Sequence, residues 1–136
     1  MNIEIKKIRP EDTYQIRHAV MWSDKSIDFV KIADDTEGVH LGLFVEEKLA
    51  SIVSLFFKNH TVQFRKFATL VKFQGRGLGM MLLNHVFQYV ENQGIKKIWC
   101  NARSDKKGFY EKFGMVVTSE PLLKNGIEYV VMERYF

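Results

Sequence analysis

The chain has 136 residues, of which 46% are hydrophobic, 13% aromatic and 26% charged, with a formal net charge of +4. This length fits a single domain over residues 1–136, and the apolar fraction excludes an intrinsically disordered chain. The single cysteine, Cys100, excludes an intramolecular disulfide framework and a multi-cysteine zinc site, so no metal is expected.

Charge blocks and apolar runs limit the classes of partner. No run of Lys or Arg exceeds two residues, which argues against nucleic acid. No apolar run approaches the roughly 20 residues of a membrane span, and the first residues lack the long apolar stretch of a signal peptide. The sequence therefore predicts a soluble cytoplasmic protein with no membrane partner.

The first half of the chain alternates predicted strands with short helices. Pro10 presets the backbone for a first helical turn, and the acids that follow complement the helix dipole. We predict a strand over 3–8, a helix from Pro10, a short helix around 27–32, and a hairpin of strands 39–46 and 49–57.

The next predicted strand, 61–71, contains a break in its alternation. Phe64 and Phe67 lie three residues apart, so they cannot share one face of a regular strand. One extra residue between them would return both rings to the same face, and we therefore predict a β-bulge there.

The clearest helix runs from Leu78 to Val90, where apolar residues recur at helical spacing, and it ends at Gly94. Its predicted apolar stripe comprises Leu78, Met81, Leu82, His85, Val86, Tyr89 and Val90. A strand over 96–101, a short helix over 109–113, and strands over 115–118 and 127–134 follow.

This order of elements predicts an α/β fold. Its mixed, mostly antiparallel sheet would hold six to seven strands and be flanked by helices. The final strand is expected to be an exposed edge, which could pair across a homodimer.

The most informative segment lies between the predicted strand 61–71 and the long helix. It consists of Gln74, Gly75, Arg76, Gly77, Leu78 and Gly79. Three glycines in five positions let backbone N–H groups converge, and the helix start adds unpaired N–H groups, so the segment fits a pyrophosphate. A Walker loop is absent, and the third glycine of a Rossmann fingerprint would fall on Met80.

The segment resembles the Gln/Arg-x-x-Gly-x-Gly/Ala loop of the GNAT N-acetyltransferase superfamily, which binds acetyl-coenzyme A. The strands 67–71 and 95–101 flank it in the family's order. Residues 108–115 then resemble the family's Phe-Tyr-x-x-x-Gly-Phe segment, with Met115 in place of the usual Phe.

The resemblance implies an acyl-CoA N-acyltransferase fold and an enzyme that moves the acetyl group of acetyl-CoA, its cosubstrate, to a primary amine. The acceptor would be a small molecule or a peptide that attacks the thioester directly. The strand before the loop is expected to splay from the next parallel strand. Backbone groups of Thr69, Leu70 and Val71 would then hold the pantetheine arm, and a backbone N–H would face the thioester oxygen.

Tyr110 matches the family tyrosine that donates a proton to the departing thiolate. A phenol, with an ordinary pKa of about 10, is protonated at neutral pH and can serve a thiol leaving group. The alternative interpretation is an aromatic ring packed in the core.

No matching base is evident, because the strand between Thr61 and Val71 has no Asp or Glu. His40 is the titratable candidate, since an imidazole titrates near neutrality. The alternative is deprotonation of the amine through ordered water.

The remaining candidates have structural alternatives of equal weight. Asn101 could hold the coenzyme or cap the end of a strand, and Arg103 and Lys107 could hold the coenzyme or lie in a solvated basic loop. Arg17 and Trp22 could line the acceptor pocket, although core packing explains Trp22 equally well. Cys100 is predicted to be a small buried residue rather than an acyl carrier.

Two further hypotheses concern charge and activity. Arg65 and Lys66, beside the predicted bulge, could steer an acidic acceptor or form a solvated strand edge. The alternative function to an enzyme is a non-catalytic acyl-CoA-binding or regulatory module, which would not need Tyr110.

Overall fold

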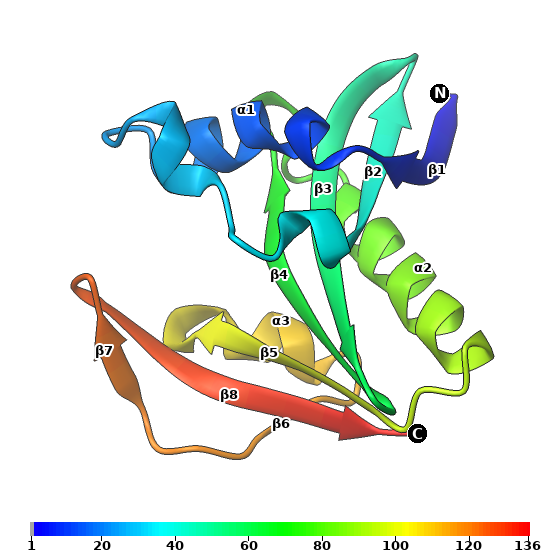
Figure 1. Cartoon of the computed structure of the whole chain (residues 1–136), viewed down its shortest axis with the longest axis vertical. Coiled ribbons are helices and arrows are strands. Elements are labelled where there is room, and N and C mark those ends of the chain that lie inside the picture. Colours follow the sequence, from blue (N-terminus) through cyan, green and yellow to red (C-terminus); the bar gives the residue numbers. More distant parts are fainter. Residues whose placement is uncertain (1) are drawn as a thin grey trace.

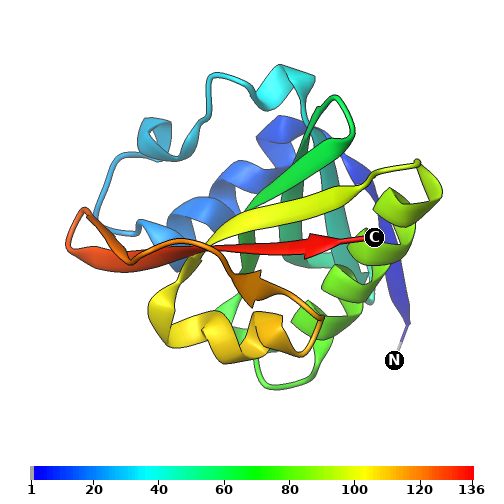
Figure 2. The same cartoon turned by 90° about the horizontal axis from the view of Figure 1, so that it is seen from below.

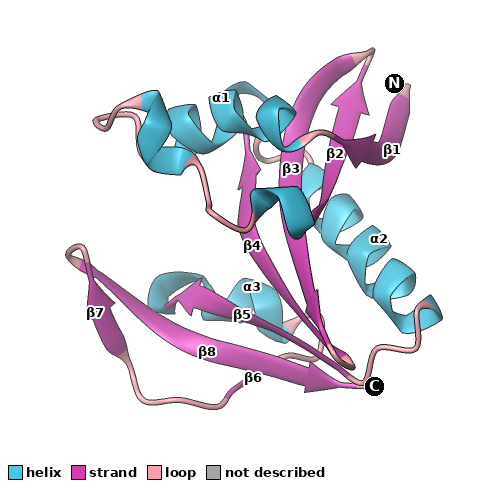
Figure 3. Ribbon diagram, viewed as in Figure 1, coloured by secondary structure: helices cyan, strands magenta, loops and turns pink. Residues whose placement is uncertain are grey.

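The computed structural model describes residues 2–136 as one curved sheet with helices on both faces (Figure 1). The strands are β1 (Ile3–Ile8), β2 (Val39–Val45), β3 (Lys48–Lys58), β4 (Thr61–Thr69), β5 (Lys97–Arg103), β6 (Val116–Val117), β7 (Leu122–Lys124) and β8 (Ile127–Tyr135). The α-helices are α1 (Tyr14–Ile16), α2 (Leu78–Asn92) and α3 (Lys107–Glu111). Figure 3 distinguishes these helices, strands and loops by colour.

The sheet has eight strands in the order β1-β2-β3-β4-β5-β8-β6, with β7 also paired to β8. Every pair is antiparallel except β4 with β5. The predicted mixed, mostly antiparallel class is therefore confirmed, but the predicted number of strands is too low. The missed strand, β7, consists of three exposed residues and carries no alternation of buried and exposed positions.

The prediction that the last strand is an exposed edge is wrong. β8 pairs with β5 along one side and with β6 and β7 along the other. Both edges of β8 are therefore already paired within the chain, so this strand does not offer the free edge expected for a homodimer.

The two faces of the sheet carry two hydrophobic clusters, and Figure 2 shows the helices on either side. The larger cluster packs α2 against β2–β5, and the smaller joins Ile16 to Ile52 and Ala68. The predicted helix from Pro10 is one helical segment to Met21 that passes from 3₁₀ to α to π winding. None of the helices within residues 2–136 is long and apolar enough to cross a membrane.

The buried face of α2 is rotated from the predicted stripe. Met81 is exposed, whereas Leu83 and Phe87 are buried. Phe87 stacks on Phe113, with ring centroids 5.6 Å apart, so the C-terminal part of the chain packs on this side of the helix. The spacing of residues within the helix does not reveal such a contact.

The predicted bulge in β4 is confirmed. Between Ile52 and Ser54 of β3 there is one residue, but between their partners Ala68 and Arg65 there are two. Lys66 at this point has a φ of 55°, in the left-handed region. The rings of Phe64 and Phe67 consequently meet on one face, with centroids 6.5 Å apart.

The parallel strands β4 and β5 separate soon after they begin. Only residues 61–63 pair with residues 97–99, after which the two strands diverge, as Figure 1 shows. The diverging edges leave backbone groups of β4 without a neighbouring strand, and this opening positions the site described next.

Candidate active site

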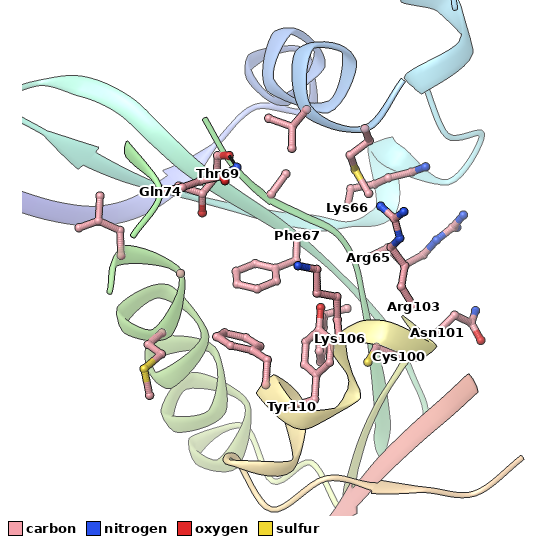
Figure 4. A pocket seen from close by; sticks show the side chains of 18 of the residues that line it. Arg65, Lys66, Phe67, Thr69, Gln74, Cys100, Asn101, Arg103, Lys106 and Tyr110 are labelled. Carbon is pink, nitrogen blue, oxygen red and sulfur yellow. Dashed lines mark hydrogen bonds between the residues drawn. The ribbon is translucent and has the colours of Figure 1, made fainter. Parts of the chain in front are cut away.

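A pocket of about 590 Å³ opens where β4 and β5 diverge (Figure 4). Its wall is built from the bulged part of β4, the loop before α2, the end of β5, α3, and the segment 20–22 that follows α1. Segments distant in the sequence thus meet at the gap in the sheet.

The glycine segment forms one end of this pocket. Gly77 caps α2 with a φ of 76° and Gly75 has a φ of 79°, so both occupy a backbone region that other residues rarely adopt. No side chain caps the helix and its first turn holds no acidic residue, which leaves the N-terminal N–H groups available to an anion. A side chain at Gly79 would approach the Phe67 ring to 3.2 Å.

Only part of the predicted pantetheine site lies in the pocket. Thr69 lines it, but Leu70 and Val71 do not. The Gln74 amide donates to the Thr69 carbonyl at 2.8 Å, and the Leu70 N–H donates to the Ala50 carbonyl at 2.9 Å. The unpaired edge of β4 that borders the opening therefore lies earlier, over residues 64–68.

Tyr110 lies on α3 among aromatic rings, with centroids 5.3 Å from Phe109, 5.8 Å from Phe64 and 6.4 Å from Phe67. Within residues 2–136 its hydroxyl makes no hydrogen bond, and the residue lines the pocket. Burial, and to a lesser degree the neighbouring Cys100, raises the pKa of the Tyr110 phenol. The hydroxyl is thus protonated and available as a donor.

Cys100 is buried beside the pocket, as predicted for a small apolar residue. Burial raises the pKa of its thiol to about 12, so the nucleophilic thiolate is disfavoured. This environment argues against an acyl-cysteine.

The structure does not support His40 as a base. Its side chain is only 2% exposed and does not line the pocket. Nε2 lies 2.8 Å from the Asp35 carbonyl, and Nδ1 lies 2.7 Å from the Ser54 hydroxyl. Because a carbonyl can only accept, Nε2 donates, and both ring nitrogens are already occupied.

Arg17 is likewise absent from the pocket, contrary to its predicted role in acceptor binding. It is fully buried and forms two hydrogen bonds with the Asp35 carboxylate, at 2.9 and 3.0 Å. It also donates to the Val30 carbonyl and to the Ser54 hydroxyl. Arg17 therefore fixes the segment that leads to Trp22 rather than contacting a ligand.

The other predicted residues divide between the pocket and the surface. Gln74, Gly75, Gly77, Leu78, Gly79, Asn101, Arg103 and Trp22 line the pocket. Arg76 and Lys107 do not; the pocket is lined instead by the adjacent Lys106. Trp22 packs edge-on against Phe29, with centroids 5.1 Å apart.

Several lining residues were not predicted, among them Val20, Phe109, Lys112 and Tyr129. Phe109 directly precedes Tyr110 and could have been found from that position. Tyr129 enters because β8 lies beside β5, and the sequence gives no local signal of that pairing.

Comparisons with known proteins agree with this geometry. A family model described as "Acetyltransferase (GNAT) domain" matches residues 21–136. The chain is 35% identical over 140 residues to YitI, described as an uncharacterized N-acetyltransferase of Bacillus subtilis (strain 168), with 96% of this chain and 94% of YitI covered.

Solved structures share the fold. A candidate N-acetyltransferase from Lactobacillus plantarum has a TM-score of 0.89 at 21% identity, with 99% of each chain covered. A GNAT family acetyltransferase from Elizabethkingia anophelis, solved with acetyl-CoA bound, has a TM-score of 0.76 at 21% identity, also with 99% of each chain covered.

The family-model match and the similarity to YitI show that the chain belongs to the GNAT acetyltransferase family. It is accordingly an acetyl-CoA-dependent N-acetyltransferase, as the resemblance of residues 74–79 and 108–115 predicted.

Proposed function

We propose that this chain transfers the acetyl group of acetyl-CoA to the primary amine of a small molecule or peptide in the pocket between β4 and β5. The observation that carries the proposal is the combination of an uncapped helix start, an unpaired edge of β4 and a free Tyr110 hydroxyl in one opening.

The coenzyme's pyrophosphate would bind the N–H groups around Gly75, Gly77 and Gly79, since the space beside Gly75 and Gly77 is open and the dipole of α2 favours negative charge. The pantetheine arm would then follow the free edge of β4 towards the bulge, pairing its amides with backbone groups of residues 64–68. Asn101, across the opening on β5, would border the same arm.

Transfer would proceed by direct attack of a neutral amine on the thioester carbon. Negative charge that develops on the thioester oxygen would be stabilised by a backbone N–H at the bulge. The carbon–sulfur bond breaks as Tyr110 gives its proton to the leaving sulfur. The attacking nitrogen loses its surplus proton to water, and water returns a proton to the Tyr110 phenolate, which leaves the amide, free coenzyme A and the phenol restored.

The amine must first lose its proton. None of the residues that line the pocket is Asp, Glu or His, and His40 is enclosed elsewhere. We therefore propose that water carries this proton to solvent rather than one fixed base.

The test is incubation with acetyl-CoA and a panel of amines, with thiol release and the acetylated product both measured. An enzyme gives equal amounts of thiol and acetylated amine. A protein that binds acetyl-CoA and acetylates no amine would instead be the non-catalytic acyl-CoA-binding module.

A further inference from the structure

The charge of the pocket wall is one-sided. The wall carries five cationic side chains and no acidic one: Arg65, Lys66, Arg103, Lys106 and Lys112. The chain as a whole has 20 Lys and Arg against 16 Asp and Glu, so its average composition does not account for this imbalance. A pocket lined in this way attracts and holds negative charge.

Three of these cations gather at one end. In Figure 4, Arg65, Lys66 and Arg103 lie together at the end opposite Gln74, and Lys106 lies between the two ends. None of the three forms a salt bridge with any acidic residue in the part of the chain that the structure describes. Arg65 is held against the Phe56 ring, with its guanidinium 5.7 Å from the centroid.

Lys66 is the most constrained of the three. It occupies the bulge with a left-handed φ of 55° and is half-buried. Burial lowers the pKa of its ammonium, and the charges of Arg65, Arg17 and Lys124 lower it further. Asp35, the one opposing charge, is already paired with Arg17. An anion beside Lys66 would relieve this repulsion.

The coenzyme's pyrophosphate does not account for the cluster under the proposed function, because it is assigned to the glycine segment. Thr69, which borders that segment, lies three residues from Lys66. At about 3.3 Å per residue, this separates the two ends by about 10 Å along β4. The cluster thus lies at the bulge, where the thioester would be, and not beside the pyrophosphate.

The pocket also has an apolar wall. Trp22 and Tyr129 line the same pocket, from the segment after α1 and from β8 respectively. Together with the cations they fit a ligand that has an apolar part and a negatively charged group.

We infer that the acceptor is an amine that also carries an anionic group, a carboxylate or a phosphate, bound by Arg65, Lys66 and Arg103. This inference rests on the proposed function and specifies its acceptor. Arg65 and Arg103 each present a planar fork that matches either anion with two hydrogen bonds. Lys66, at the bulge, would hold the same group close to the thioester.

The experiment compares amines that differ in the anionic group but have similar amine basicity. The pairs are 4-aminobutanoate with 4-aminobutanamide, and O-phosphoethanolamine with ethanolamine, assayed by thiol release. We expect kcat/KM for at least one anionic member to exceed that of its neutral partner tenfold or more, about 1.4 kcal/mol. The pair that responds distinguishes carboxylate from phosphate.

Substitutions connect this preference to the cluster. Arg103→Gln and Lys66→Gln should each reduce the anionic-to-neutral ratio, and Lys66→Arg should preserve it because the charge is retained. Lys58→Gln, an exposed cation outside the pocket wall, is the matched control and should leave the ratio unchanged. The dissociation constant for acetyl-CoA, measured in parallel, should change little in all four.

Three results would overturn the inference. They are preference for the neutral amines, unchanged ratios in Arg103→Gln and Lys66→Gln, or loss of acetyl-CoA affinity in those variants, which would assign the cluster to the coenzyme. If Lys66→Arg instead abolishes turnover with all amines, Lys66 acts as a proton acceptor and not as an anion site. Failure to acetylate any amine would reject the proposed function itself.

Discussion

Two observations bear on Tyr110 as the proposed proton donor. Its hydroxyl has no partner among residues 2–136, so it is free to meet a ligand, and burial raises the pKa of its phenol. A raised pKa keeps the acid form present across the whole neutral and mildly alkaline range. The rings around it hold the side chain in position without using the hydroxyl.

Tyr110→Phe should therefore lower kcat by about 10–100-fold, with little change in KM for acetyl-CoA. Because the donor does not ionise between pH 6 and 9, the loss should be the same at every pH in that range. The measurement is a steady-state pH profile with any accepted amine, where chemistry limits turnover. Tyr89→Phe, on α2 and outside the pocket wall, is the control. Full activity of a folded Tyr110→Phe protein would assign the proton donation to water.

The buried pair of Arg17 and Asp35 is the second residue-scale feature with a measurable consequence. Burial alone would raise the pKa of Asp35, but the Arg17 hydrogen bonds, the Ile32 N–H and the Arg17 charge hold it below the ordinary value. The pair therefore stabilises the fold above about pH 4, and its contribution is lost as the pH falls through the lower pKa of the folded state.

Asp35→Asn should reduce the free energy of unfolding by about 3–5 kcal/mol at neutral pH, because it leaves the Arg17 charge buried and uncompensated. Denaturant unfolding at pH 7 and at acidic pH provides the measurement, and the difference from the wild type should narrow on acidification. Asp28→Asn removes an exposed pair with Lys31 and should not measurably change stability. Equal effects of the two substitutions would contradict the structural role of the buried pair.

At the scale of elements, the start of α2 is the feature on which coenzyme binding is proposed to depend. Gly77 and Gly94 provide a matched comparison, since their φ angles are 76° and 74° and neither has an atom within 4 Å of an added Cβ. Gly77 opens into the pocket, whereas Gly94 follows the other end of the same helix. Substitution at the two positions should strain the backbone similarly.

Gly77→Val should weaken acetyl-CoA binding more than tenfold, about 1.4 kcal/mol or more, because its side chain enters the space for the pyrophosphate. Gly94→Val should lose comparable stability and keep its affinity. Calorimetric titration with acetyl-CoA, with thermal melting of both variants, separates strain from binding. Unchanged affinity in a folded Gly77→Val protein would locate the phosphate site elsewhere.

How far each element could be predicted depends on whether its signal is local. The β4 bulge follows from the parity of Phe64 and Phe67, and the glycine segment from its composition, so both are visible in the sequence. The rotation of α2 depends on Phe87 meeting Phe113, and β7 on pairing with a distant strand. Neither contact produces a periodic pattern in the sequence.

The residues of the candidate site also divide into those with a local sequence signal and those without one. Tyr110 and residues 74–79 belong to short motifs and could be located, whereas the roles of Arg17 and His40 could not. Both carry residue types typical of active sites, but the fold uses them in one buried hydrogen-bond network with Asp35 and Ser54. Only the three-dimensional arrangement shows that this network lies outside the pocket.

At the scale of the whole molecule, the sheet consists of two parts joined weakly at the opening. Strands β1–β4 form one part and β5–β8 the other, and the two parts share only three paired positions between β4 and β5. A coenzyme bound in the opening would touch β4 on one side and β5 with α3 on the other. We therefore expect the ligand to couple the two parts of the sheet.

Acetyl-CoA at about 100 times its dissociation constant should stabilise the fold by about 2.7 kcal/mol, a rise in Tm of the order of 10 °C. Amide hydrogen exchange should show which residues the bound acetyl-CoA stabilises. Slowing should concentrate in residues 64–69, 75–80 and 101–110, which border the opening from both parts. Amides of the β1–β2 pair, remote from the pocket, should slow only through the global change. A ligand held by the glycine segment alone would not reach β5. Slowed amide exchange that is confined to β4 and α2 would therefore show that the coenzyme does not bridge the opening.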